Sequence, residues 1–365
     1  MDRIPNNKNP LLIMNRLQAV RAFGQRIWLD NLSRDLIASG ALIRLFEEDG
    51  IAGVTSNPSI FEKAIRTDAR YRDDLAALRL RALNAEHTYE SLVIRDIRDA
   101  CDLLAPQYQA SNGDDGYVSL EVSPALAHDE AGTVAAARRL WAAVGRPNAM
   151  IKVPATPAGI GALATLTREG INVNITLIFS LRQLDNVWDA YLAGLAARYG
   201  DGEPVGHVKA VASFFLSRID NAVDGRVPPP VRGRVAVALA KLAYARYRER
   251  FHGEGFAKLR RAGARPQYLL WASTGTKNPD YSDVLYVESL IGPETINTVP
   301  DATLAAFRDH GVAAPTLESG LEDARNVIRT AGEAGVDLAE VGEMLQQDGL
   351  RQFDDAFAKL MALTG

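Results

Sequence analysis

The feature of this sequence that most constrains its fold is a repeated alternation of short apolar runs with longer segments of helical spacing. The short runs are candidate strands, at 26–32, 54–56, 117–122, 150–153, 171–178, 208–215, 267–272 and 295–299. Helical patterns separate most of them, for example at 128–144, 157–169, 181–199 and 231–251. A strand–helix unit repeated eight times in 365 residues predicts a (β/α)8 barrel.

The regions outside this repeat predict additional helices. The stretch 61–110 contains few helix breakers, and its about fifty residues exceed a single crossover helix. It therefore predicts two or three helices inserted after the second strand, and 303–363 predicts further helices at the C-terminus. Shorter helices are expected at 17–23 and 33–48, whereas 284–291 fits either helix or strand.

No linker divides the sequence, so we expect one barrel domain over residues 1–365. The alternative is a doubly wound open sheet, which would favour a Gly-rich turn after the first strand. The sequence has no such turn and no Gly-rich phosphate loop. The N-terminal residues 1–14 are expected to form a loose leader, since they are rich in Asn and Pro and lack the apolar core of a secretory signal.

Composition narrows the possible partners and location. A net charge of -4 and a pI near 5.8 do not indicate a nucleic-acid-binding protein, and no apolar stretch of about eighteen residues predicts a membrane span. Cys101 is the single cysteine, which excludes an internal disulfide and fits the cytoplasm. The five histidines are scattered, so we expect no metal site. Assembly stays open between a monomer and a small homo-oligomer.

Polar residues cluster at the ends of the candidate strands. Barrel enzymes place their chemistry at the carboxyl ends of the strands, on side chains that point inward. The residues at those positions are Asp30, Asn57, Glu121, Lys152, Asn174, Thr176 and Ser213. One cation and two carboxylates in this set suit covalent amine catalysis with acid–base assistance. The alternative is a buried polar network without catalytic use.

Lys152, in the run AMIKVP, is the most informative of these residues. A buried ammonium is costly, but a desolvated lysine can lose its proton and attack a carbonyl to form a Schiff base. The alternative is a lysine that extends to solvent or pairs with a carboxylate. Among the eight lysines, Lys152 and Lys209 lie in strand-like runs. Lys209 opens its strand at the opposite end of the barrel, whereas Lys152 closes its own.

Two cations follow later strands and could bind an anionic substrate. Arg218 comes after the sixth strand in SFFLSRID, and Lys277 comes after the seventh in WASTGTKNP. Both would lie in loops above the barrel. Either could equally be a solvated loop charge.

Seven motifs, in order, strongly resemble the transaldolase family of class I aldolase-type enzymes. They are IWLDNLSR, GVTSNPSIF, YVSLEVSP, AMIKVPAT, INVNITLIFS, ASFFLSRID and WASTGTKNP, and they extend from Ile27 to Pro300. The chain is similar to the longer bacterial subfamily. The resemblance implies a Schiff-base transfer of a dihydroxyacetone unit from a ketose phosphate to an aldose phosphate, without a metal or organic cofactor.

The resemblance also implies individual roles. Lys152 would form the imine, Asp30 would act as acid and base on the substrate hydroxyl, and Glu121 would work through a catalytic water. Thr176 would help to hold that water. The positions implied for substrate binding are Asn57, Asn174, Ser213 and, for the phosphate, Arg218.

The sequence departs from the family pattern in two places. Better-known members have an arginine after the seventh strand, where this chain has TGTK, so Lys277 is the candidate second phosphate ligand. The chain also has SFF where others have a proline after the serine. A fructose 6-phosphate aldolase-like enzyme, a metal-dependent aldolase and a catalytically silent barrel stay open as alternatives.

Overall fold

A computed structural model describes residues 15–365, so the leader expected at 1–14 lies outside the described residues. The strands are β1 Gln25–Leu29, β2 Gly53–Val54, β3 Tyr117–Glu121, β4 Ala149–Pro154, β5 Val173–Ile178, β6 Ala210–Phe215, β7 Tyr268–Ala272 and β8 Thr295–Val299. They pair in parallel and in chain order, and β1 pairs with β8 to close a barrel. The predicted (β/α)8 barrel is confirmed, and the open-sheet alternative is wrong.

Helices surround this barrel, and additional helices follow β2 and β8. They are α1 Arg16–Arg21, α2 Arg34–Ala38, α3 Ala41–Asp49, α4 Pro58–Thr67, α5 Arg72–Arg79, α6 Ala85–Ala110, α7 Glu130–Val144, α8 Pro157–Glu169, α9 Leu181–Gly200, α10 Ser217–Val223, α11 Val235–His252, α12 Glu254–Arg261, α13 Leu285–Glu288, α14 Asp301–His310, α15 Leu321–Glu333 and α16 Leu338–Thr364. The insertion after β2 consists of α4, α5 and α6. The predicted insertion and the predicted C-terminal helices are therefore both confirmed.

Some predicted boundaries were wrong. The single helix expected at 33–48 is two helices, because Gly40 between them has a left-handed backbone with φ of 70°. The strand expected at 26–32 ends at Leu29, so Asp30 is the first residue beyond it. The ambiguous segment 284–291 contains the short helix α13, and α12 was not predicted.

The register of the sheet decides which polar residues become neighbours. Glu121 of β3 pairs with Lys152 of β4, and Lys152 pairs with Asn174 of β5. Farther along, Pro154 pairs with Thr176. Residues separated by tens of positions in the sequence thus lie side by side at the carboxyl end of the barrel.

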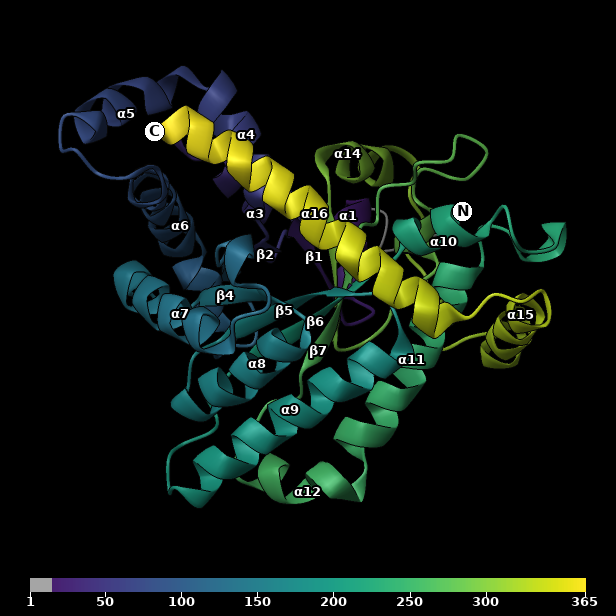
Figure 1. Cartoon of the computed structure of the whole chain (residues 1–365). Helices are drawn as coiled ribbons and strands as arrows, with labels where there is room; N and C mark the ends of the chain where they lie inside the picture. The colour runs from purple at the N-terminus through teal and green to yellow at the C-terminus, as the bar shows by residue number, and fades with distance from the viewer. Residues whose placement is uncertain (1–14) are drawn as a thin grey trace, which may run out of the picture.

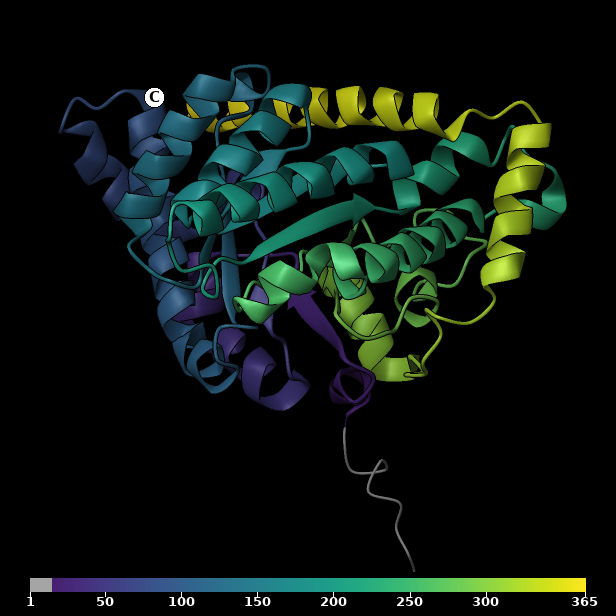
Figure 2. The same ribbon diagram turned by 90° about the horizontal axis from the view of Figure 1, so that it is seen from below.

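The C-terminal helix α16 crosses this end of the barrel. Figure 1 shows it running diagonally in front of the strands, and Figure 2 places it along one edge of the molecule, beyond the strands and the helices around them. Its 27 residues begin at Leu338 and follow the N-cap Asp337, whose side chain accepts hydrogen bonds from the backbone N–H groups of Ala339 and Glu340. The helix is long enough to span the barrel and to reach α4 and α6 on the far side.

Candidate active site

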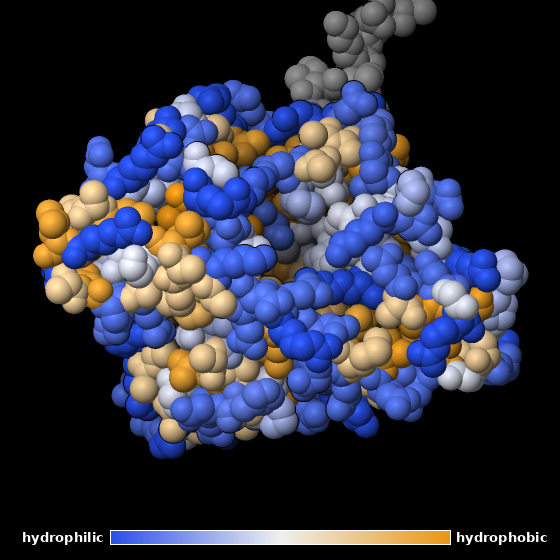
Figure 3. Space-filling view, turned by 45° about the horizontal axis from the view of Figure 1, so that its top comes forward, coloured by the Kyte–Doolittle hydropathy of each residue, from blue (hydrophilic) through white to orange (hydrophobic). Residues whose placement is uncertain are grey.

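A small cavity of about 130 Å³ lies at the carboxyl ends of the strands. Its walls include several residues predicted from the sequence, namely Asp30, Asn57, Lys152, Thr176, Ser213 and Arg218. Asp30 and Asn57 also line a larger groove of about 650 Å³, which extends outward past α4 and the start of α14. Figure 3 shows a face of the molecule that is mainly hydrophilic and hollowed near its centre.

Lys152 is buried in the wall of the cavity, with its amine beside the Glu121 carboxylate. Its Nζ lies 3.3 Å from Glu121 Oε2 and donates a hydrogen bond of 3.1 Å to the backbone oxygen of Ser56. Glu121 is equally buried, and burial raises its pKa to about 7, although Lys152 opposes the shift. This carboxyl group can therefore gain or lose a proton near neutral pH.

Asp30, the first residue after β1, lines the same cavity as Lys152 of β4. Its Oδ1 accepts a hydrogen bond of 2.8 Å from Thr55 Oγ1, which is also 2.6 Å from Thr298 Oγ1. Burial raises the pKa of Asp30, and the charge of Lys152 and the Thr55 hydrogen bond counteract this. Asp30 and the Lys152 amine thus line the cavity, whereas Glu121 does not line it and lies behind the amine. Both carboxyl groups have raised pKa values.

The polar residues of β5 and β6 differ in how many hydrogen bonds they make. Asn174 donates to Ser119 Oγ at 3.1 Å and accepts from Ser213 Oγ at 2.7 Å, so it lies in a network beside the cavity wall. Thr176 Oγ1 is buried and has no hydrogen-bond partner within residues 15–365. A buried hydroxyl that lines a cavity without a partner is suited to bind a water molecule or a substrate oxygen.

Asn57 has a structural role in addition to its place in the wall. Its Oδ1 accepts a hydrogen bond of 3.0 Å from the backbone N–H of Ile60, which caps the N-terminus of α4. Pro58 at the first position of α4 ends the preceding extended segment. Capping therefore fixes the orientation of the Asn57 side chain at the cavity.

The two candidate anion-binding cations lie near each other. Arg218 was expected in a loop, but it lies on the short helix α10, directly after β6. Its Nη1 is buried and has no hydrogen-bond partner in the described part of the chain. Lys277 does lie in a loop, and its pKa is lowered by burial and by the charge of Arg218. The charge of Asp348 on α16 partly compensates Arg218. Two cations held close together, one of them with an unpartnered buried nitrogen, still favour an anionic ligand.

Sequence reasoning missed several residues of the cavity wall. Thr55 could have been found, because it is two positions before Asn57 in the motif GVTSNPS. In an extended segment, side chains two positions apart point to the same face. Ser273 follows β7 with a left-handed backbone at φ of 54°. Phe353 comes from α16, and its ring centroid is 5.6 Å from Lys152 Nζ. No motif points to Phe353, because its proximity depends on the path of α16 over the barrel.

Two other properties of residues 15–365 complete the description. None of their helices combines the length and the apolar character needed to span a membrane. No three or more of their His, Cys, Asp and Glu side chains form a group that could hold a metal ion.

Comparison with known proteins gives a match over nearly the whole chain. The sequence model of the Transaldolase/Fructose-6-phosphate aldolase family matches residues 27–364. A transaldolase of Thiobacillus denitrificans is 54% identical over 359 residues, which cover 96% of this chain and 100% of that protein. A transaldolase of Neisseria gonorrhoeae is 50% identical, covering 96% and 99% of the two chains. Transaldolase 2 of a Nostoc species is 44% identical, covering 96% and 97%.

These matches reach farther than the sequence motifs did. The motifs ended at Pro300, whereas the family match continues through α14, α15 and α16. The C-terminal helices are thus part of the family's sequence pattern. The chain belongs to the transaldolase/fructose-6-phosphate aldolase family.

Proposed function

We propose that this chain catalyses the transaldolase reaction with Lys152 as the Schiff-base lysine. The donor is a ketose phosphate such as sedoheptulose 7-phosphate or fructose 6-phosphate. The acceptor is an aldose phosphate such as glyceraldehyde 3-phosphate or erythrose 4-phosphate, and the reaction belongs to the cytoplasmic pentose phosphate pathway. The observation that carries the proposal is the buried Lys152 amine in the cavity wall, 3.3 Å from Glu121.

The first stage forms the covalent adduct. The Lys152 amine, after transfer of a proton to Glu121, attacks the ketone carbon and forms a carbinolamine. Glu121 then supplies a proton, through a water molecule held by Thr176, to the hydroxyl that leaves as water. The pKa of about 7 suits Glu121 to both steps. The product is an iminium ion on Lys152.

The second stage breaks and forms carbon–carbon bonds. Asp30 accepts the proton of the C4 hydroxyl, the C3–C4 bond breaks, and its electron pair moves into the iminium ion. An aldose phosphate leaves, and the three-carbon unit stays bound as an enamine. The enamine carbon then attacks the carbonyl carbon of the acceptor aldehyde, and a new carbon–carbon bond forms. Hydrolysis of the resulting iminium ion releases the new ketose phosphate and restores Lys152. Because the iminium ion is the electron sink, the proposed reaction includes no metal or organic cofactor.

The phosphate group of each substrate is proposed to bind Arg218 and Lys277. The unpartnered, buried Nη1 of Arg218 supports this assignment, since a buried guanidinium nitrogen requires a hydrogen-bond acceptor. Asn57, Asn174 and Ser213 are proposed to bind the substrate hydroxyl groups. Phe353 covers the Lys152 side of the cavity and would limit access of water to the enamine.

The test is to trap the imine. Sodium borohydride in the presence of fructose 6-phosphate should produce a stable adduct with the mass of a reduced dihydroxyacetone unit, and peptide mapping should locate it on Lys152. Failure to trap an adduct, or an adduct on another lysine, would disprove the proposal. Release of free dihydroxyacetone without an acceptor, at a rate equal to transfer, would instead identify a fructose 6-phosphate aldolase activity.

A further inference from the structure

The residue after Thr176 has an unusual backbone conformation. Leu177 is left-handed, with φ of 60°, which is unfavourable for a residue that carries a Cβ. The register of β5 against β6 shifts between Ile175 and Ile178, so Leu177 lies in a bulge. Such a bulge turns the neighbouring side chains away from their regular directions, and Thr176 is one of them. The surrounding structure must stabilise it.

Helix α16 supplies a group that binds the backbone on both sides of Thr176. Gln346 Nε2 donates hydrogen bonds of 3.0 Å to the backbone oxygens of Ala155, just after β4, and of Leu177. Gln346 is 7% exposed, so water does not compete freely with these bonds. The Ala155 N–H in turn donates to the Thr176 oxygen at 2.7 Å. One amide group thus joins the strand ends that flank the Thr176 hydroxyl.

The helix also packs closely on Leu177. A Cβ added to Gly349 would lie 2.7 Å from Leu177 Cδ2, closer than van der Waals contact allows. A glycine at this position lets the backbone of α16 approach the Leu177 side chain. A further hydrogen bond of 3.3 Å, from Gln183 Nε2 to the Gly342 oxygen, attaches the first half of α16 to α9.

We propose that Gln346 is a positioning residue: by holding the Leu177 bulge, it directs the Thr176 hydroxyl into the cavity. Without its two hydrogen bonds, Leu177 relaxes to a regular strand conformation and Thr176 Oγ1 turns out of the cavity. This inference rests on the role proposed above for Thr176. It makes α16 part of the machinery for imine formation as well as a cover for the barrel.

The first experiment compares two glutamines on the same helix. Gln346→Met removes both donated hydrogen bonds and nearly preserves the shape of the side chain. Gln347→Met makes the same chemical change at the next position, which is exposed. We measure the single-turnover rate of borohydride-trapped adduct formation with fructose 6-phosphate. A displaced catalytic group can cost up to about a hundredfold, and we expect a loss of about tenfold for Gln346→Met. Gln347→Met should stay within about twofold of the unchanged chain.

The second experiment separates positioning from a purely structural role. If Gln346 acts through Thr176, then Gln346→Met should change the rate less than about twofold when Thr176→Ala is already present. A tenfold loss in that background would overturn the proposal, as would a wild-type rate for Gln346→Met. Circular dichroism melting shows whether each variant is folded at the assay temperature. If Gln346→Met is not folded, Gln346→Glu removes the same donors with the same side-chain shape, and the same outcomes apply.

These outcomes also differ from a failure of the proposed function. An unchanged chain that forms no adduct disproves the function and this inference together. An unchanged chain that forms the adduct, with a Gln346→Met variant that forms it equally fast, disproves the inference alone.

Discussion

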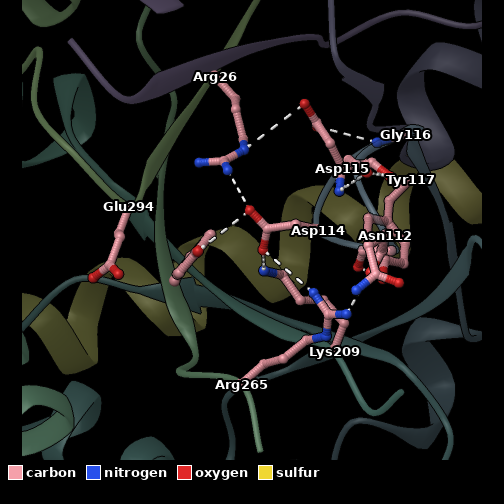
Figure 4. A network of polar contacts seen from close by, with 12 residues as sticks. Arg26, Asn112, Asp114, Asp115, Gly116, Tyr117, Lys209, Arg265 and Glu294 are labelled. Atoms are coloured by element: carbon pink, nitrogen blue, oxygen red, sulfur yellow. Dashed lines mark hydrogen bonds and ion pairs between the residues drawn. The ribbon is translucent and has the colours of Figure 1, made fainter. Parts of the chain in front are cut away.

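Both ends of the barrel bury a lysine beside a carboxylate, but the two pairs differ in their surroundings. At the carboxyl end, Lys152 lies 3.3 Å from Glu121, and the two border or adjoin a cavity. At the amino end, Lys209 lies 2.6 Å from Asp114, and its Nζ is 3.6 Å from the ring centroid of Tyr268. Figure 4 shows that Arg26 and Arg265 also converge on Asp114, from other parts of the chain.

The difference appears in the ionisation of the two carboxyl groups. Burial by itself would raise the pKa of Asp114, but Lys209 and Arg26 together outweigh it and hold the pKa below its usual range. Glu121 has one nearby cation, so burial dominates and raises its pKa to about 7. The number of compensating cations therefore decides whether the buried carboxyl group stays ionised or exchanges protons near neutral pH. The lysine of the amino-end pair behaves differently, because burial lowers the pKa of Lys209 to about 8. The Asp114 network joins residues in or next to β1, β3, β6 and β7 at the amino end, whereas the Lys152–Glu121 pair is suited to chemistry.

The largest expected effect comes from exchanging each lysine for methionine. Lys152→Met should abolish both the borohydride adduct and transfer, because the nucleophile is absent. Lys209→Met should still form the adduct at Lys152. Its free energy of unfolding should fall by about 1.5–3 kcal/mol, because Asp114 loses one charge-assisted hydrogen bond and keeps Arg26 and Arg265. Trapping with mass spectrometry and urea denaturation measure the two effects.

The comparison fails if the effects are reversed. Adduct formation by Lys152→Met, or its complete loss in a folded Lys209→Met variant, would contradict the roles given to the two ends. Lys258→Met, which changes an exposed lysine of α12, is the matched control and should alter neither property.

The second effect concerns the pH dependence of the Glu121 pair. The reactive form has an ionised Glu121 that can accept a proton from the Lys152 amine. Below a pH of about 7, Glu121 is protonated and can no longer accept it, so the rate of adduct formation should fall as the pH decreases. Glu121→Gln should lower the rate by about a hundredfold or more and remove this limb of the profile. Single-turnover trapping from pH 5 to 9, values chosen about two units on each side of that pKa, tests this.

If the rate of adduct formation by Glu121→Gln still falls at low pH, a group other than Glu121 controls this part of the pH profile. Asp114→Asn is the matched control at the amino end. Its low-pH limb should coincide with that of the unchanged chain, because Asp114 precedes β3 at the amino end of the barrel and does not line the cavity.

The smallest expected effect comes from the phosphate site. Arg218→Gln should raise KM for fructose 6-phosphate by about ten- to a hundredfold, since a hydrogen bond to a charged group contributes about 1.5–3 kcal/mol. Donors without a phosphate group should bind equally well to both forms. Steady-state kinetics with fructose and fructose 6-phosphate measure the difference. An equal rise in KM for both sugars would show that Arg218 shapes the cavity without binding phosphate.

Much of the site follows from periodicity and from the position of residues at strand ends. Glu121 ends β3, and Lys152 lies two residues before the end of β4, where the parallel register pairs the two residues. The sequence predicted that Lys152 closes its strand, which is wrong by two residues, but its end of the barrel was predicted correctly. Arg218 could be placed just beyond β6 in the same way, although its helix was not predicted, because α10 has only 7 residues and no side-chain cap. The break at Gly40 was missed because glycine is tolerated inside helices as well as at their ends.

The sequence alone determined the barrel, its inserted helices and the convergence of Asp30, Glu121 and Lys152. The strand–helix alternation can be read locally, and each strand of such a barrel pairs in parallel with the next strand along the chain. Only the tertiary structure decided that α16 crosses the carboxyl end, bringing Phe353 to Lys152 and Gln346 to the Leu177 bulge. These contacts join residues separated by more than 150 positions. They depend on where a long helix packs, and helical spacing shows which residues share a face of a helix but not what that face will contact.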